Sequence, residues 1–577
     1  MSRFNLLHGN WRYTGVHDSY DILGASVVGS LGFILSYRYV LGVREFPISV
    51  YVIEFLITAF FITAVRVGLR ILAETAARVP ITSARKQTLI IGAGFAAHMI
   101  IREIQGTPSD HWVVGCLDDN PKKFGSKILG KPVMGSVDQL PGMVSAYGID
   151  EVLIAVPSAT GAQMRRFVDV CQAAGVKFST VPSLQDLISG KANIQQLRQV
   201  DLEDLLGRDP VEIDLESVRN VIEGKVVMVT GAAGSIGSEL CRQLSRYEPA
   251  KLICLDQSET GLFYLEKELG RHHKVYSVAD YTNSIGMQQE ISHHRVHIIF
   301  HAAAYKHVPM MEENPREAIR NNVLGLKELL QVADESGCKE FILISSDKAV
   351  NPSSIMGATK RIGELMMCSR PKGKMRCVTV RFGNVLGSQG SVVPVFQKQL
   401  LEEKRITVTH PDINRFFMTI PEAASLVLQA SAVGQQGDVL VLDMGEPIRI
   451  VDLARTLIRL SGKTEKEIPI VYTGLRPGEK LYEELFYSWE QVQDTHHDKI
   501  KRTQGQIIGW AELNARLEML RRSIYISSEN DLRVMVQSII PEYQYGGPAA
   551  AAAAANTSSG YAWPLSSEIS VSASAQD

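Results

Sequence analysis

The stretch that most constrains the fold is VVMVTGAAGSIGSEL, residues 226–240. A strand-like apolar run ends at Thr230, and three glycines in the spacing G-x-x-G-x-x-G follow before a helical pattern begins. Glycines at such spacings let a turn close tightly, let the backbone approach a pyrophosphate and let the helix pack on the strand. The next strand-like run ends at Asp256, about 20 residues on, where an acid can bind a ribose 2′-hydroxyl. This order predicts a dinucleotide-binding α/β domain.

The sequence also indicates which dinucleotide the loop binds. The phosphates would lie at the N-terminus of a helix over residues 235–246, where free N–H groups favour anions. An acid at the ribose repels a 2′-phosphate, so NAD is favoured over NADP. Asp280 ends the following strand-like run and could meet the adenine. The cofactor-binding residues predicted from this pattern are Gly231, Gly234, Ser235, Ile236, Gly237, Asp256 and Asp280.

A second, weaker glycine loop lies upstream. It reads Gly92-x-Gly94-x-x-Ala97 after a strand-like run, and Asp118 and Asp119 end the next one. It could bind a nucleotide, but no catalytic residues surround it. A structural or regulatory domain with an empty site, or with an unknown ligand, fits at least as well.

The chain of 577 residues is long enough for two or three domains. Strand-like runs alternate with helical stretches, which predicts parallel sheets. The predicted fold is α/β, with two Rossmann-like parallel-sheet domains following an N-terminal transmembrane helical hairpin. The predicted divisions are a membrane anchor (1–80), a Rossmann-like domain (81–190), a linker (191–222), a catalytic domain (223–545) and a disordered Ala/Ser-rich tail (546–577).

Two apolar runs motivate the hairpin. Residues Asp21–Tyr37 and Phe46–Val65 are each about as long as a bilayer requires, roughly 20 residues. More arginines follow the second run than lie between the two, so the positive-inside rule predicts a cytoplasmic catalytic domain. We therefore expect a multi-pass protein of the inner membrane. A pair of buried helices in a soluble protein is the alternative.

Charge and cysteine content exclude other classes. Lys and Arg (60) nearly balance Asp and Glu (62), so nothing favours nucleic acid as a partner. The seven cysteines are scattered and none has zinc-like spacing, so we expect a reducing compartment and no structural metal.

The segment SSDKAVNPSSIMGATK, Ser345–Lys360, follows a strand-like run, and open α/β sheets place ligands at that end of a strand. It resembles the active-site segment of short-chain dehydrogenases, which carries Tyr-x-x-x-Lys. Here the pattern is Met356-x-x-x-Lys360, and a thioether cannot carry a proton.

Further motifs occur in order: HAAAYKHVPMMEENP, RFGNVLGSQGSVVPVF, RFFMTIPEA and GLRPGEKLYEEL. With these, residues 1–540 resemble the membrane-anchored UDP-N-acetylglucosamine 4,6-dehydratases of polysaccharide biosynthesis, which are extended short-chain dehydrogenase/reductases. Such proteins usually have four membrane helices, whereas this sequence has two apolar runs. The resemblance implies oxidation of the sugar at C-4 by a tightly bound NAD, loss of water across C-5 and C-6, and return of hydride to C-6.

The resemblance also implies the catalytic roles. Asp347 would be the acid at the C-6 hydroxyl and Lys348 the base at C-5. These roles require a protonated Asp347 and a neutral Lys348, and a tight ion pair between them would oppose both. With Met356 replacing tyrosine, Ser346 is the candidate to relay the C-4 hydroxyl proton through Lys360 or water, and Lys360 would also hold the nicotinamide ribose.

Other positions are carried over in the same way. The resemblance adds Ala302 to the cofactor contacts, and it gives as contacts to the UDP-sugar Lys306, Asn322, Asn384, Arg415 and Arg476. Two arginines suit a pyrophosphate. Asn322 could instead brace the fold, and Lys306 could face solvent. We also expect a homo-oligomer.

Two other functions remain open from the sequence. A nucleotide-sugar C-4 epimerase would use the same scaffold but needs no C-5 base, so the Asp347–Lys348 pair argues against it. A membrane sensor or scaffold that binds nucleotide sugar without turnover is suggested by Met356 and by the additional Rossmann-like domain.

Overall fold

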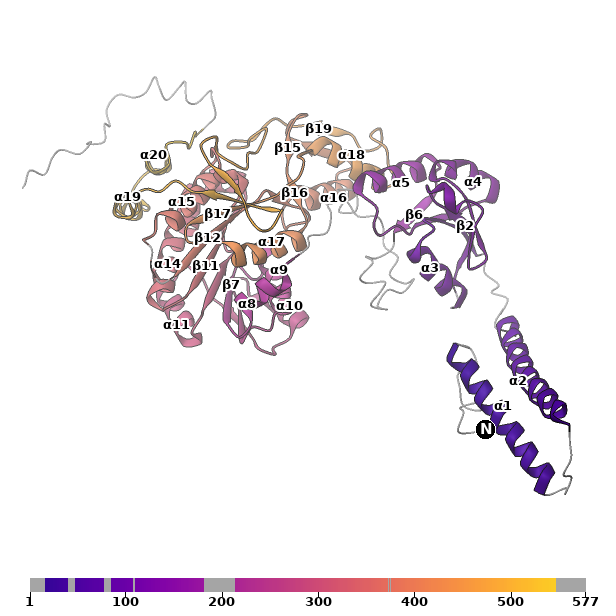
Figure 1. Cartoon of the computed structure of the whole chain (residues 1–577). Helices are drawn as coiled ribbons and strands as arrows, with labels where there is room; N and C mark the ends of the chain where they lie inside the picture. The colour runs from indigo at the N-terminus through magenta and orange to yellow at the C-terminus, as the bar shows by residue number, and fades with distance from the viewer. Residues whose placement is uncertain are drawn as a thin grey trace, which may run out of the picture. The chain divides into compact units, whose positions relative to one another are not determined.

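The computed structural model describes residues 16–39, 47–76, 85–106, 109–180, 213–371, 373 and 375–545 (Figure 1). The predicted tail at 546–577 and the start of the chain lie outside these residues. The two apolar runs form helices α1 (Val16–Tyr39) and α2 (Ile48–Ala76), which contact each other.

The predicted transmembrane hairpin is not supported. Among the helices of the described segments, none combines the length and the apolar character that crossing a bilayer requires. The polar residues Ser26 and Ser30 lie in the first run and Glu54 in the second, and Glu54 accepts a hydrogen bond from Thr58 Oγ1 (3.0 Å). The predicted inner-membrane localisation depended on this hairpin and stays a prediction.

The first α/β domain is built around the upstream glycine loop. Within the described residues its sheet has six strands in the order β3-β4-β2-β1-β5-β6, with β1 parallel to β5 and β5 to β6. Buried apolar residues on both faces of β1, such as Leu89 and Ile90, form its core with α3 and α5. The elements are β1 (Lys86–Ile91), α3 (Phe95–Gly106), β2 (His111–Leu117), η2 (Pro121–Lys123), β3 (Lys127–Ile128), β4 (Lys131–Gly135), η3 (Val137–Gln139), α4 (Leu140–Tyr147), β5 (Glu151–Ile154), α5 (Gly161–Ala173) and β6 (Lys177–Thr180).

The larger sheet belongs to the domain predicted to be catalytic (223–545), which is called the catalytic domain below. In the described residues it has nine strands in the order β20-β21-β17-β12-β11-β10-β7-β8-β9; those from β9 to β17 are parallel, and β21 and β20 continue the sheet antiparallel. The strand-like runs predicted to end at Thr230 and Asp256 form β7 and β8. The strands are β7 (Val226–Thr230), β8 (Lys251–Asp256), β9 (Lys274–Val278), β10 (Ile298–His301), β11 (Glu340–Ile344), β12 (Arg376–Arg381), β17 (Asp438–Leu442), β20 (Val492–Asp494) and β21 (Ile500–Gln504).

Helices cover both faces of this sheet, as Figure 1 shows. Because side chains alternate along a strand, Val227 and Val229 point to one helical layer and Met228 to the other. The first layer is α8 (Leu215–Ile222), α9 (Ser235–Leu244), α10 (Glu259–Leu269) and α17 (Ile420–Val433); the second is α11 (Ser284–His294), α14 (Leu326–Glu335), α15 (Ile355–Ser369), α19 (Trp510–Ser523) and α20 (Glu529–Ile539).

The α8 helix falls in the predicted linker, yet its Val218 and Ile222 are buried in the catalytic core. The end of that segment therefore packs with the catalytic domain, while residues 181–212 lie outside the described part. The other elements of the described part of this domain are α12 (Val308–Glu313), α13 (Pro315–Ile319), η5 (Arg320–Gly325), η6 (Asp347–Ala349), β13 (Asn384–Val385), α16 (Val392–Glu402), β14 (Ile406–Val408), β15 (Asn414–Arg415), β16 (Phe417–Met418), β18 (Ile448–Arg449), α18 (Ile450–Leu460) and β19 (Ile470–Tyr472).

Candidate active site

The glycine loop after β7 accepts no larger residue at two of its three glycines. Gly231 has a φ of +73°, and a Cβ there would lie 2.6 Å from the backbone nitrogen of Ala303. A Cβ at Gly237 would lie 2.0 Å from the carbonyl oxygen of Gly231. The glycines therefore leave bare backbone at the start of α9, in the position that a pyrophosphate requires.

The residues around the loop also fit a dinucleotide. Asp256 accepts hydrogen bonds from the amides of Ala233 (3.0 Å) and Ser258 (2.9 Å), and a carboxylate has further lone pairs for a ribose hydroxyl. Ala302 lies at the end of β10, beside Gly231. Asp280 follows β9 and is exposed; its side chain accepts hydrogen bonds from Thr282.

The catalytic segment begins where β11 ends. Asp347 is fully buried, and its Oδ1 accepts hydrogen bonds from Ser346 Oγ (2.9 Å) and Lys348 Nζ (2.9 Å). Its other oxygen, Oδ2, is buried without a hydrogen-bond partner among the described residues. The structure thus brings the three predicted catalytic residues 346–348 into direct contact.

The Lys348 ammonium has three oxygen neighbours. Besides Asp347, it donates to Asn384 Oδ1 (2.9 Å) and lies 3.6 Å from Glu483 Oε1. Burial lowers the pKa of Lys348, but the carboxylates of Asp347 and Glu483 outweigh burial and raise it. The ion pair is the arrangement that opposes the predicted acid and base roles, so a proton must be redistributed before Lys348 can act as a base.

Met356 and Lys360 lie apart from the groups that surround Lys348. Helix α15 is capped by Ser354, whose Oγ accepts from the Gly357 amide (3.1 Å), and the Met356 side chain is 2 % exposed within the apolar core. Lys360 Nζ donates to the carbonyl of Ile344 (2.9 Å), and burial lowers the pKa of Lys360 to about 8. Lys360 lines a small cavity with His301, not the cleft that Lys348 lines.

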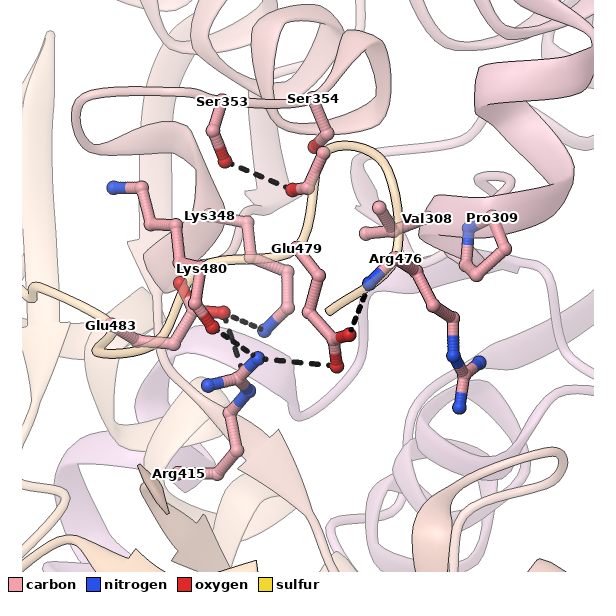
Figure 2. A pocket seen from close by; sticks show the side chains of 11 residues that line it. Val308, Pro309, Lys348, Ser353, Ser354, Arg415, Arg476, Glu479, Lys480 and Glu483 are labelled. Atoms are coloured by element: carbon pink, nitrogen blue, oxygen red, sulfur yellow. Dashed lines mark hydrogen bonds and ion pairs between the residues drawn. The ribbon is translucent and has the colours of Figure 1, made fainter. Parts of the chain in front are cut away.

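The cleft beside Lys348 has about 530 Å³ of empty space and opens to solvent. Figure 2 shows that its wall carries acidic and basic groups in alternation. It is lined by Val308, Pro309, Lys348, Ser353, Ser354, Arg415, Arg476, Gly478, Glu479, Lys480 and Glu483.

The two predicted pyrophosphate arginines differ in their surroundings. Arg415 is 7 % exposed; its guanidinium donates to the carbonyls of Asn414 (2.6 Å) and Lys480 (2.8 Å) and lies 3.4 Å from Glu483. Arg476 is exposed, and Figure 2 shows its guanidinium directed away from the acidic groups that surround Arg415. Of the two, Arg476 presents the more accessible charge to the cleft.

Of the remaining predicted substrate residues, two form hydrogen bonds to other residues of the chain, and the third lies outside the cleft lining. Asn384 holds Lys348, as described above. Asn322 braces Tyr305, accepting from its amide (2.9 Å) and donating to its carbonyl (3.0 Å), and it also donates to Thr359 Oγ1 (3.0 Å). Lys306 is exposed and is not part of the cleft lining.

A buried charge cluster beneath the catalytic segment was not predicted. Arg381 on β12 pairs with Glu364 (2.8 Å) and Glu490 (2.8 Å), and all three side chains are fully buried. Glu364 also accepts from Ser345 Oγ (2.8 Å), the residue that follows β11. The cluster holds the end of β11 in place, and no sequence signal singled it out because its members are far apart along the chain.

Comparison with known proteins identifies two matched regions. Residues 227–505 match the family described as polysaccharide biosynthesis protein, and residues 10–182 match a family described as CoA-binding domain. The chain is 34 % identical to a UDP-glucose 4-epimerase of Rickettsia canadensis over 284 residues, which are 47 % of this chain and 80 % of that protein.

Two relatives match over most of their length. The capsular polysaccharide biosynthesis protein CapD of Staphylococcus aureus is 40 % identical over 510 residues, covering 86 % of this chain and 84 % of that protein. The probable polysaccharide biosynthesis protein EpsC of Bacillus subtilis is 41 % identical over 495 residues, covering 84 % and 81 %. Together with the glycine loop after β7 and the segment after β11, two parallel strands that flank β10, these matches show that the chain belongs to the polysaccharide biosynthesis protein family.

Proposed function

We propose that the protein is an NAD-dependent nucleotide-sugar 4,6-dehydratase that converts UDP-N-acetylglucosamine to a UDP-4-keto-6-deoxy sugar for cell-surface polysaccharide biosynthesis. The observation that carries the proposal is the contact between Asp347 and Lys348 beside an open cleft at the carboxyl end of β11. Elimination of water across C-5 and C-6 needs an acid and a base held close together, and this pair supplies both groups.

The cofactor site is assigned to the loop after β7. The pyrophosphate would be held by Gly231, Gly237 and the first turn of α9. The Asp256 carboxylate would accept a hydrogen bond from the ribose 2′-hydroxyl, which favours NAD over NADP. When bound, the nicotinamide supplies reversible hydride transfer at the sugar C-4. The cofactor is regenerated in each turnover, so we expect it to stay bound.

The residues around the cleft then have separate tasks. Lys348 takes the C-5 proton, and Asp347 protonates the departing C-6 hydroxyl. The Ser346 hydroxyl donates a hydrogen bond to Asp347 in the structure. With substrate bound, it would orient the C-4 hydroxyl group of the sugar and relay its proton. Arg476 would bind the pyrophosphate, since its charge lines the cleft and is exposed.

A C-4 epimerase is the second candidate, because a relative named UDP-glucose 4-epimerase matches about half of this chain. An epimerase removes and returns hydride at C-4 only. It has no use for a base directed at C-5, so it leaves the contact between Asp347 and Lys348 without a role.

Product analysis separates the candidates. Purified protein incubated with UDP-N-acetylglucosamine should give a product lighter by one water, and NMR should identify a 4-keto-6-deoxy sugar and its configuration at C-5. A product of unchanged mass would establish the epimerase instead. Tight cofactor and substrate binding without turnover at any pH would support a sensor or scaffold and contradict both enzymes.

A further inference from the structure

Residues 478–487 form hydrogen bonds with four residues of the catalytic segment, all between positions 349 and 353. Residues 478–485 of this 478–487 segment are the end of the motif GLRPGEKLYEEL (474–485), in which Arg476 is the predicted pyrophosphate ligand. The bonds are Ser353 Oγ to Gly478 O (2.9 Å), Lys480 Nζ to Val350 O (2.8 Å), Asn351 Nδ2 to Glu484 Oε2 (3.1 Å) and Tyr487 Oη to Ala349 O (2.8 Å). The motif therefore positions the residues that follow Lys348.

Glu483 is the member of this segment that reaches the base. Its side chain is 3 % exposed, with Oε1 3.6 Å from Lys348 Nζ and 3.4 Å from Arg415 Nε, and Figure 2 shows it between these two cations. Its Oε2 is buried and has no hydrogen-bond partner within the part of the chain that the structure describes. Glu483 is therefore a buried carboxylate between two cations at the wall of the cleft. This arrangement favours a role in the site over the role of an ordinary surface charge.

We infer that Glu483 is a positioning residue that acts through Lys348: its carboxylate fixes the ammonium group beside Asp347 and balances the charge that Lys348 carries after it takes the C-5 proton. This inference rests on the proposed dehydratase function. In that step the C-5–H electrons form the C-5=C-6 double bond as the C-6–O bond breaks. The proton moves to Lys348 Nζ, and the oxygen takes a proton from Asp347 and leaves as water.

The charges around Lys348 predict how Glu483 affects the reaction. Asp347 from η6 and Glu483 face Lys348 with negative charge, Arg415 from β15 adds positive charge, and Asn384 is neutral. Only neutral Lys348 can take a proton, so the rate should rise with pH on the acidic side of its profile. Removing the Glu483 charge should lower the pKa of Lys348 and shift that acidic limb down by about one pH unit or more.

The test uses the full-length protein with UDP-N-acetylglucosamine in deuterated buffer, and it measures C-5 exchange and product formation against pH. Glu483→Gln should shift the acidic limb to lower pH and reduce the maximal rate, because the less basic Lys348 is a weaker proton acceptor. Glu483→Asp, which keeps the charge but withdraws it from Nζ, should shift the limb by a smaller amount. Glu484→Gln is the matched control, because Glu484 bonds Asn351 and Lys480, and its limb should coincide with that of the wild type.

A slower Glu483→Gln variant with an unshifted limb would overturn the inference, because a purely structural role lowers the rate without moving the profile. An equal shift in Glu484→Gln would overturn it too. If circular dichroism shows that Glu483→Gln is unfolded, the pH profile of Glu483→Asp is used instead. A shift of its acidic limb to lower pH then supports the inference, and an unshifted limb overturns it. Absence of exchange and of dehydrated product in the wild type is a different result, which contradicts the proposed function itself.

Discussion

The two glycine loops of this chain share two backbone features and differ in their surroundings. In each, the first glycine has a positive φ, +101° at Gly92 and +73° at Gly231, and a Cβ would collide with the backbone that follows a neighbouring strand. In each, a loop amide donates to the acid after the next strand: Ala93 to Asp118 (2.8 Å) and Ala233 to Asp256 (3.0 Å).

The difference lies in what else contacts those acids. Asp118 also pairs with Lys123 (2.7 Å), and Asp119 pairs with Arg166 (2.7 Å), so the first domain neutralises its own carboxylates. Among the described residues, Asp256 accepts hydrogen bonds from the backbone amides of Ala233 and Ser258 and forms no ion pair, and its domain adds the segment after β11 that contains Asp347 and Lys348. A glycine loop thus builds a turn in both domains, and the neighbouring side chains decide whether that turn is part of a reaction site.

The largest expected difference between the domains concerns their lysine–aspartate pairs. Lys348→Ala should reduce C-5 proton exchange by about 100-fold to 10 000-fold, because it removes the base. Lys123→Ala removes the pair to Asp118, which is far less buried, and should leave exchange at the wild-type rate. Mass-spectrometric deuterium incorporation measures both. Unchanged exchange in Lys348→Ala would exclude Lys348 as the base.

The arginine networks should differ next. Arg381→Met would leave Glu364 and Glu490 as buried carboxylates without their main partner, and it should lower the free energy of unfolding by about 3–5 kcal/mol. Arg166→Met breaks half-exposed pairs in the first domain and should cost less than about 1 kcal/mol. Urea denaturation of both variants checks this, and equal losses would show that burial does not separate the two networks.

The smallest predicted effect distinguishes the loops themselves. Gly237→Ala places a methyl group 2.0 Å from a backbone oxygen, so it should weaken NAD binding by about tenfold or more and cost about 1–3 kcal/mol of stability. At the corresponding position the first loop already carries Ala97, and Gly94→Ala meets nothing within 4 Å. Calorimetric titration with NAD should therefore detect a change for Gly237→Ala only; full affinity in that variant would exclude this loop as the phosphate site.

Local sequence was sufficient for the frame of the catalytic domain. The strand β7, the glycine loop, α9 and the acid Asp256 form one continuous stretch, so spacing alone predicted their arrangement. Asp347 and Lys348 were expected to act together because they are adjacent, but the ion pair that they form is the arrangement that their predicted roles exclude. The membrane-spanning hairpin is not supported, because no helix among the described residues is both long enough and apolar enough to cross a membrane.

The contacts that tune the site were not predictable in this way. Glu483 lies 135 positions beyond Lys348 by residue number, and Asn384 reaches the same ammonium from β13. Arg415 lines the cleft, but its hydrogen bonds to the carbonyls of Asn414 and Lys480 could not be inferred from its motif. No periodicity links such residues, so a pattern can identify them as candidates without assigning their partners.

The sequence by itself determined that this chain builds a parallel α/β domain with a glycine turn for a dinucleotide and an Asp–Lys pair after β11. Those features depend on backbone conformation and on near neighbours, which spacing specifies. Tertiary structure alone decided that Met356 enters the core and that Lys348 lies between two carboxylates. The protonation state of a buried lysine depends on the charges around it and on its loss of water, and both are set by segments that meet only when the chain folds.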